Sequence, residues 1–204
     1  MLEIVREKTD RPTHLLEKDV WVIWTLGAIF NSPVAADLTF KGGTSLSKAY
    51  EVIVRFSEDI DLTYDIRRLI RDLIGEDGPL PANRSQASKI RGERYARHWH
   101  DLAALGRSQY FASVIADRNV TASVARHKSF FFIEKDRAGV TIDYERAVTG
   151  DLKIVPEGDA LAALAEDYGK MITDDVMFGK ALTFEQLIRV CREVETQAND
   201  ATAI

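Results

Sequence analysis

The sequence predicts an α+β protein with a small sheet in its first half and a mostly helical second half. Two short stretches, residues 36–40 and 59–63, place apolar residues at alternate positions, which is the period of a β-strand. From residue 101 onward, apolar residues recur instead at the spacing of amphipathic helices. A chain of 204 residues with 46% hydrophobic and 29% charged residues suits one large or two small folded domains and argues against overall disorder.

Two helices are predicted around the first strand. The first precedes it and contains Trp21, Ile23, Trp24 and Leu26. The second follows the pair Gly42-Gly43, and its helical spacing is carried by Leu46, Ala49, Tyr50, Ile53 and Val54. Glycines at such a turn let the backbone approach a ligand closely. We expect Thr44 or Ser45 to cap the second helix, so that its free N–H groups face an anion such as a triphosphate.

The second strand carries two alternating aspartates. Residues i and i+2 of a strand share a face, so Asp59 and Asp61 are expected to project together while Ile60 and Leu62 face the core. Two carboxylates are a hard-oxygen site for Mg²⁺ or Mn²⁺, completed by the phosphates of an NTP substrate. A Gly-Gly turn or an Asp-x-Asp edge alone is common on solvated surfaces. Their succession favours phosphoryl or nucleotidyl transfer, and no P-loop motif offers a competing interpretation.

The same residues carry a family resemblance. The run from Phe40 to Tyr50, FKGGTSLSKAY, followed by RFSEDIDL from Arg55 to Leu62, closely resembles the first motif of the AbiEii/AbiGii toxin family of nucleotidyltransferases. The resemblance extends to residues 17–22, 97–102, Pro156 and 167–171. It implies a nucleotidyltransferase-like mixed sheet core of the polymerase-beta type with a helical C-terminal part. Members of the family act as toxins in toxin–antitoxin or phage-defence pairs, some by adding nucleotides to the acceptor ends of tRNAs.

The resemblance also implies roles for individual residues. Asp59 and Asp61 would be the catalytic metal ligands, Ser57 would lie beside the triphosphate, and Asp101 would be a supporting acid. The nucleotide-binding set would comprise Gly42, Gly43, Thr44, Ser45, Lys48 and Ser57. The implied partners are an NTP, an RNA (tRNA) or protein acceptor, and a cognate antitoxin.

One departure from the family concerns the middle of the chain. Family members carry a long strand-bearing segment after the Asp-x-Asp strand, with a further acidic residue and a lysine. Here a helical run, 66–74, and a breaker-rich loop, 75–85, lead directly to the next motif, which places a junction near Arg91-Gly92. The predicted domains are a nucleotidyltransferase-like core over 1–91, which lacks those central strands, and a helical domain over 92–204.

A basic stripe lies at this junction. It consists of Lys89, Arg91, Arg94 and Arg97. Spacings of three bring the arginines near one helix face, where they could contact triphosphate or RNA, although a solvated helix face explains the pattern equally well. The formal net charge of −5 argues against attraction of the whole molecule to nucleic acid, so binding would depend on local clusters.

Several other residues have a structural interpretation and a functional one. Asp143 could bring a third acid on a strand, but an N-capped helical turn is the stronger interpretation. Cys191 is interpreted as a buried thiol and not as a nucleophile. The run Phe130-Phe131-Phe132 could stack bases, yet buried aromatics fit the pattern better. His98 and His100 lack zinc-ligand spacing, and Trp99 and Leu102 are expected to pack inward.

The second half is predicted to be helical over residues 101–105, 110–116, 120–128, 159–172 and 183–196. Asp159 is expected to cap one helix, and Thr183 with Gln186 forms a capping-box pattern. The longest apolar run, residues 20–30, is too short for a membrane helix and the charged N-terminus is no signal peptide, so a cytoplasmic protein is expected. The leading hypothesis is a Mg²⁺-dependent nucleotidyltransferase toxin. The alternatives are a catalytically incomplete module that binds NTP, RNA or an antitoxin, and a self-associating remnant.

Overall fold

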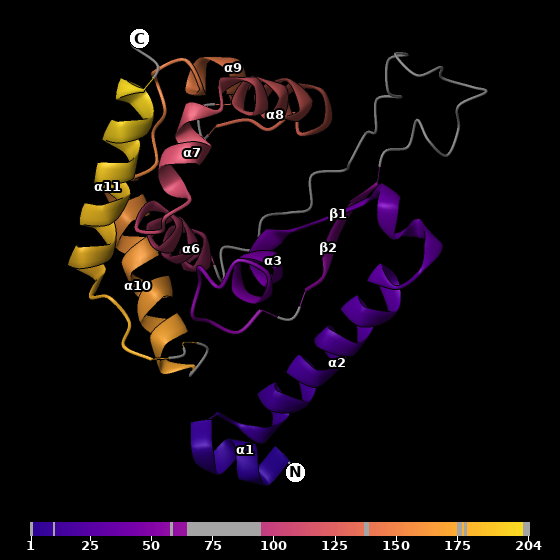
Figure 1. Ribbon diagram of the computed structural model, residues 1–204. Coiled ribbons are helices and arrows are strands. Elements are labelled where there is room, and N and C mark those ends of the chain that lie inside the picture. Colours follow the sequence, from indigo (N-terminus) through magenta and orange to yellow (C-terminus); the bar gives the residue numbers. More distant parts are fainter. Residues whose placement is uncertain are drawn as a thin grey trace. The chain divides into compact units, whose positions relative to one another are not determined.

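The computed structural model describes residues 2–9, 11–57, 59–64, 95–136, 139–174, 177 and 179–201 (Figure 1). The chain divides into two compact units. One comprises Met1–Leu80 with Asp175–Ala181, and the other comprises Pro81–Asp174 with Leu182–Ile204. The predicted helix 66–74, the loop 75–85 and the domain boundary at 91/92 lie outside the described residues. The α+β class is confirmed, because the first unit contains a sheet and the second is helical in its described part.

The first unit begins with two helices, α1 (Leu2–Thr9) and α2 (Thr13–Phe30). The predicted N-terminal helix is therefore confirmed and is longer than its tryptophans indicate, whereas α1 was not predicted. Pro12 precedes α2, in keeping with the fixed φ of proline at helix starts. The rings of Phe30 and Phe40 lie 6.1 Å apart, so the end of α2 is joined to the first strand by an aromatic contact.

Strands β1 (Leu38–Lys41) and β2 (Asp61–Tyr64) pair antiparallel, with Lys41 opposite Asp61. Both strands start later than the alternation predicts. Residues Pro33–Asp37 form a 3₁₀ helix, η1, because Pro33 suits its first position. Asp59 lies before β2, so the predicted strand start is wrong, but Asp59 and Asp61 are both exposed while Ile60 and Leu62 are half-buried.

Helix α3 (Gly42–Lys48) follows β1 directly and contacts both strands. Its N-cap is Lys41, which makes no side-chain cap bond, so the predicted capping by Thr44 or Ser45 is wrong. The helix also ends earlier than its apolar spacing predicts. Glu51 adopts a left-handed φ of 52°, which stops the helix, and Ile53 and Arg55 are then buried on either side of the exposed Val54. That alternation is the period of an extended chain.

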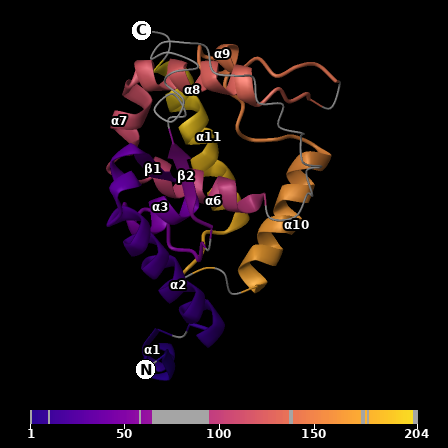
Figure 2. The ribbon, with the colours of Figure 1, turned by 90° about the vertical axis from the view of Figure 1, so that its right-hand side faces the viewer.

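The described part of the second unit is helical (Figure 2). Its helices are α6 (Ala96–Gly106), α7 (Phe111–Ala116), α8 (Arg118–Phe131), α9 (Tyr144–Ala147), α10 (Asp159–Thr173) and α11 (Phe184–Asp200). Helix α6 packs against α10 and α11, and the buried core between them contains Ala96, Ala103, Leu164, Tyr168, Leu187, Ile188 and Cys191. Trp99 and Leu102 pack against this core, as predicted.

Side-chain caps begin three of these helices. Asp117 accepts from the backbone N–H of Val120 at the start of α8, and Thr183 with Gln186 forms the predicted capping box of α11. Asp143 accepts from the backbone N–H of Arg146 at 3.0 Å and so caps α9, which confirms the structural interpretation of this aspartate. The predicted cap Asp159 is wrong, because Gly158 is the N-cap of α10 and Asp159 lies within its first turn.

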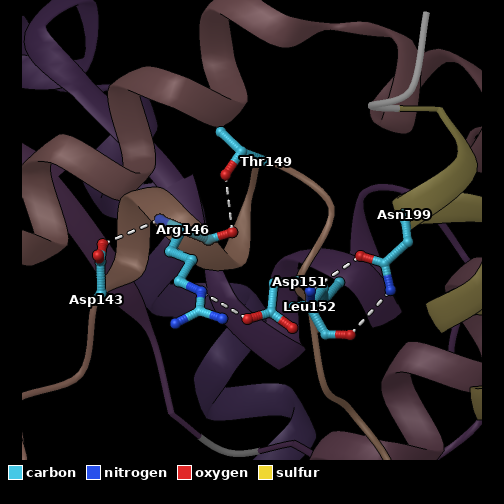
Figure 3. A network of polar contacts seen from close by, with 6 residues as sticks. All are labelled: Asp143, Arg146, Thr149, Asp151, Leu152 and Asn199. Atoms are coloured by element: carbon cyan, nitrogen blue, oxygen red, sulfur yellow. Dashed lines mark hydrogen bonds and ion pairs between the residues drawn. The ribbon is translucent and has the colours of Figure 1, made fainter.

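The segment between α9 and α10 is held to α11 by polar contacts (Figure 3). Arg146 pairs with Asp151 at 2.7 Å. Asn199 accepts from the backbone N–H of Leu152 at 2.9 Å and donates to its carbonyl at 3.0 Å, so its amide substitutes for a neighbouring strand. Glu195 accepts from the N–H groups of Ile154 and Val155. These bonds satisfy the backbone of an irregular segment.

Within the described residues, no helix combines the length and the apolar character that crossing a membrane requires.

Candidate functional site

Side chains from three parts of the first unit meet at the residues Gly42–Ser45, called here the glycine turn. These residues form the first turn of α3, directly after β1. The chain returns past them twice, once as the extended residues 53–57 and once at the start of β2. The antiparallel pairing of Lys41 with Asp61 is what brings the second aspartate back to the glycines.

Gly42 lies against the carboxylate of Asp61. A Cβ atom added to Gly42 would lie 2.1 Å from the Asp61 Oδ2, so a side chain here would force the carboxylate to move. Gly42 also has a φ of 78°, which side-chain-bearing residues rarely adopt. Glycine is therefore required at this position both for the backbone conformation and for the approach of the carboxylate.

Gly43 lies against a cation and a hydroxyl. An added Cβ would be 2.7 Å from the Nη2 of Arg55 and 3.1 Å from the Oγ of Ser57. The Arg55 side chain is nearly enclosed, since the residue is 5% exposed, and its Nη1 donates to the carbonyl of Phe56 at 2.9 Å. The backbone of Arg55 also bridges to Met177, in the segment that returns to this unit. A buried guanidinium thus lies directly against the glycine turn.

Thr44 is fully buried and ties the turn to the aspartate segment. Its hydroxyl donates to the backbone carbonyl of Asp59 at 2.5 Å and is hydrogen-bonded to the hydroxyl of Ser57 at 2.9 Å. Because a carbonyl can only accept, the single Thr44 proton is directed to Asp59. This buried side chain therefore fixes where Ser57 and Asp59 lie relative to the glycines.

The two aspartates offer exposed carboxylates near this turn. Among the residues that the structure describes, no three His, Cys, Asp or Glu side chains are grouped closely enough to hold a metal ion alone. Mg²⁺ is commonly held by one or two carboxylates together with substrate phosphates, so two hard-oxygen ligands at a turn free of side-chain bulk fit this ion. The donor chemistry of Asp59 and Asp61 is therefore compatible with Mg²⁺ bound together with a nucleotide.

Lys48 lies against a carboxylate of the protein, whereas its motif implies contact with a nucleotide. Its ammonium group forms an ion pair with Asp19 of α2, and both side chains are about three-quarters enclosed. The pair joins α3 to α2 at the far end of the glycine turn's helix. Ser45 is buried within the turn, as a cradle residue would be.

The remaining predicted site residues lie outside the described residues or belong to the second unit. Lys89, Arg91 and Arg94, like the junction at 91/92, lie outside the described residues. Arg97 and Asp101 belong to α6 in the second unit. Asp101 is 9% exposed there, with its Oδ1 3.3 Å from the Nδ1 of the equally buried His100.

Two further interpretations can be compared with the structure. Cys191 is buried in the core of the second unit, as predicted, and burial followed by the charge of Glu195 raises the pKa of its thiol to about 11. A thiol with that pKa is not a nucleophile at neutral pH. The expectation of buried aromatics at the end of α8 is wrong for Phe130 and Phe132, which are 64% and 44% exposed. The short α9 covers too little of α8 to enclose them.

Arg55 is the site residue that sequence reasoning missed. Its signal was an arginine within the apolar run Val52-Ile53-Val54-Arg55-Phe56. A charged residue in such a run is buried only when it is paired or hydrogen-bonded, which marks it as a specific contact. The helical spacing assigned to residues 46–54 concealed the alternation that buries it.

Comparison with known proteins gives one match. Residues 24–89 match the family model described as nucleotidyl transferase AbiEii toxin, Type IV TA system. Over these residues the chain is similar to the AbiEii family. The resemblance stated from the glycine and aspartate motifs is thus confirmed over a stretch that is less than half of the 204-residue chain. No curated protein and no solved structure matches the chain.

The AbiEii match contains every residue of the turn just described. It includes Gly42 to Ser45, Arg55, Ser57 and both aspartates, and it ends at residue 89, two residues before the predicted junction begins. The family consists of nucleotidyl transferase toxins of type IV toxin–antitoxin systems. This description gives the general enzyme class of the family, and it implies that the family's members use a nucleotide substrate and have an antitoxin.

Proposed function

We propose that this protein is a Mg²⁺-dependent nucleotidyltransferase toxin that transfers a nucleoside monophosphate from an NTP to an RNA end or a protein acceptor. The observation that carries the proposal is the convergence at the glycine turn. Asp61 lies against Gly42, Arg55 and Ser57 lie against Gly43, and all lie within the AbiEii segment. A turn without side-chain bulk that is flanked by a cation, hydroxyls and carboxylates matches the needs of a metal-bound triphosphate.

Each residue of the turn has a role in this proposal. The backbone N–H groups of Gly42, Gly43 and Thr44, in the first turn of α3, lack intrahelical partners and bind phosphate oxygens. Ser57 lies beside the triphosphate and is oriented by Thr44. Arg55 holds the turn against the extended segment and adds a positive charge next to it. Lys48 anchors α3 to α2 through Asp19, so that the turn stays in place when phosphate binds.

Asp59 and Asp61 would hold Mg²⁺, which when bound neutralises the charge that develops on the transferred phosphate. The Thr44 hydroxyl holds the backbone of Asp59. The β1–β2 pairing holds that of Asp61. The two carboxylates are therefore positioned by different elements, one by a buried hydroxyl and one by a strand.

The proposal also covers the acceptor of the nucleotide and the antitoxin partner. A tRNA acceptor end is the acceptor that the family resemblance implies, and the cytoplasm is the compartment where NTP and tRNA are both present. A cognate antitoxin would restrain the activity. Arg97 and Asp101, together with Lys89, Arg91 and Arg94, are proposed to support the acceptor or the triphosphate.

The test is labelling by the full chain with each of the four α-³²P-labelled NTPs, Mg²⁺ and total tRNA, with the RNA and protein fractions separated afterwards. We expect wild-type protein to label one fraction and the Asp59→Asn, Asp61→Asn double variant to lose labelling and cellular toxicity together. The Glu185→Gln, Asp200→Asn double variant removes two exposed acidic charges from α11 and is expected to retain both activities.

Toxicity that persists in the aspartate variant at equal expression would overturn this mechanism. Calorimetry of Mg²⁺-NTP binding then distinguishes between the remaining hypotheses. Binding by the wild type without labelling of any fraction would favour a non-catalytic nucleotide- or antitoxin-binding module. Absence of binding would remove the nucleotide site altogether.

A further inference from the structure

Helix α8 of the second unit carries an unusual local charge. From Arg118 to Ile133 the chain contains no acidic residue, whereas α8 contains Arg118, Arg126 and Lys128, with His127 between the last two. The chain as a whole has a formal net charge of −5. This helix is therefore a local cationic region on an acidic protein, the kind of cluster that attracts phosphate groups.

Exposed aromatic rings lie among these cations. Phe130 is 64% exposed and Phe132 is 44% exposed, and Ala125 is the buried residue of α8 within the described set. The five residues Arg126, His127, Lys128, Phe130 and Phe132 are called here the α8 surface. Large exposed rings are costly to keep in water, so an aromatic group exposed next to cations indicates a surface that binds something.

Cations and rings of the α8 surface lie close to one another. The Lys128 Nζ lies 6.0 Å from the ring centroid of Phe132 and 5.2 Å from that of Tyr144, the first residue of α9. The rings of His127 and Phe132 are 6.2 Å apart. Helix α9 packs beside α8 (Figure 1), and the Asp143 cap and the Arg146–Asp151 pair of Figure 3 fix its start and the segment that follows it.

We propose that the α8 surface binds single-stranded RNA, with bases stacking on Phe130 and Phe132 and phosphates contacting Arg126 and Lys128. Stacking on aromatic rings beside cations is how proteins bind single strands without reading their sequence. The inference rests on the proposed function for the identity of the ligand, because an RNA acceptor must be held while its end reaches the nucleotide.

The distribution of the cations favours RNA over a membrane surface. Arg126, His127 and Lys128 are consecutive, so they point about 100° apart and together span about 200° of the helix circumference. Helices that lie in a membrane interface separate an apolar face from a charged one. The acidic Glu134 lies near Tyr144, where its charge adds to burial in raising the pKa of the tyrosine.

The test is fluorescence anisotropy of a labelled oligo(U) RNA of about 12 nucleotides, a length within the usual single-strand site size, titrated with the full chain without NTP. We expect saturable binding that weakens about tenfold or more in the Phe130→Leu, Phe132→Leu variant, since stacking is lost while apolar area and helix propensity are kept. The Arg126→Gln, Lys128→Gln variant should lower the salt slope by roughly 1.4.

The matched control is Lys153→Gln, Arg189→Gln, which removes two exposed cations elsewhere in the same unit and should leave affinity and salt slope unchanged. Thermal unfolding confirms that every variant is folded. A 12-base-pair RNA duplex is also a polyanion, but it should compete poorly with the oligo(U) for the protein, because its paired bases are not available for stacking.

Three outcomes would overturn the inference. They are no anisotropy change at protein concentrations of about 100 µM, equal affinity of the leucine variant and wild type, or binding to phosphatidylserine vesicles that the leucine variant retains while RNA is not bound. The Asp59→Asn, Asp61→Asn variant is expected to lose nucleotide transfer but to bind RNA as the wild type does, so the two proposals can be tested separately. RNA binding without nucleotide transfer by the wild type would leave only the α8 proposal standing. Transfer with an unchanged KM for RNA in the leucine variant would leave only the proposed activity.

Discussion

Gly42 links the backbone conformation of the turn to the position of the Asp61 carboxylate, the proposed metal ligand. Its φ of 78° and the Asp61 Oδ2 at 2.1 Å from any added Cβ are independent reasons for glycine at this position. Gly42→Ala is therefore expected to lower the free energy of unfolding by about 1–2 kcal/mol from the left-handed φ alone. The displaced Asp61 should also reduce Mg²⁺-NTP binding. Urea unfolding and calorimetry measure the two effects.

Gly169 provides the control for that prediction. It lies in α10 with nothing within 4 Å of an added Cβ and without a positive φ. Gly169→Ala should leave nucleotide binding unchanged and raise the free energy of unfolding by up to about 1 kcal/mol, since alanine favours the helix. Equal stability effects of the two substitutions would contradict the geometry assigned to Gly42.

The Thr44 hydroxyl is the second residue-scale feature that can be isolated. Thr44→Val keeps the shape of the side chain but leaves the carbonyl of Asp59 and the hydroxyl of Ser57 without this partner. We expect a loss of about 1–3 kcal/mol in the free energy of unfolding, together with weaker nucleotide binding. Thr44→Ser keeps the hydroxyl and should lose less on both counts. Valine and serine variants that unfold at the same urea concentration would refute the role of the hydroxyl.

At the scale of a single element, the start of α11 depends on a reciprocal cap. The Thr183 hydroxyl accepts from the backbone N–H of Gln186 at 3.2 Å, and the Gln186 side chain accepts from the N–H of Thr183 at 2.9 Å. Thr183→Ala should cost about 1 kcal/mol, measured as a lower midpoint of unfolding. Because α11 supplies four of the buried residues, the loss should appear in the main cooperative transition. Thr183→Ser should be close to wild type, and a midpoint as low as that of alanine would contradict the cap.

Two elements show how apolar patterns mislead. The spacing from Leu46 to Val54 is helical, but the chain turns at Glu51 and Ile53 is buried from an extended segment. The aromatic end of α8 was expected to be buried, but the neighbouring α9 is four residues long and leaves Phe130 exposed. In both cases the pattern identifies apolar residues correctly, and the packing partner decides their environment.

At the scale of the whole molecule, Cys191 predicts how stability depends on pH. Burial raises the pKa of its thiol from 9.0 to about 11, so the folded state keeps the proton longer than the unfolded state. The contribution of the buried, protonated thiol to the free energy of unfolding is fully present below pH 9 and is lost as the pH rises through 11. Relative to a Cys191→Ala variant, wild-type protein should lose up to about 2–3 kcal/mol across that window. Unfolding curves at several pH values measure the difference, and a difference that stays constant with pH would refute the assignment.

Much of the fold was predictable because it depends on neighbours in the sequence. The sheet of the first unit, the Thr183 capping box, the Asp143 cap and the buried Cys191 each follow from local patterns of polar and apolar residues. The glycine and aspartate motifs likewise indicated the similarity of residues 24–89 to the AbiEii family model.

The sequence by itself determined the resemblance of the segment that holds Gly42-Gly43 and the two aspartates to the AbiEii family, since residue types at short spacing carry that information. Only the tertiary structure decided that Arg55 lies against Gly43, that Lys48 pairs with Asp19, and that Phe130 is exposed. Those contacts join residues that are distant in the chain or depend on what covers a surface. They depend on how the elements pack together, which propensity and periodicity do not specify.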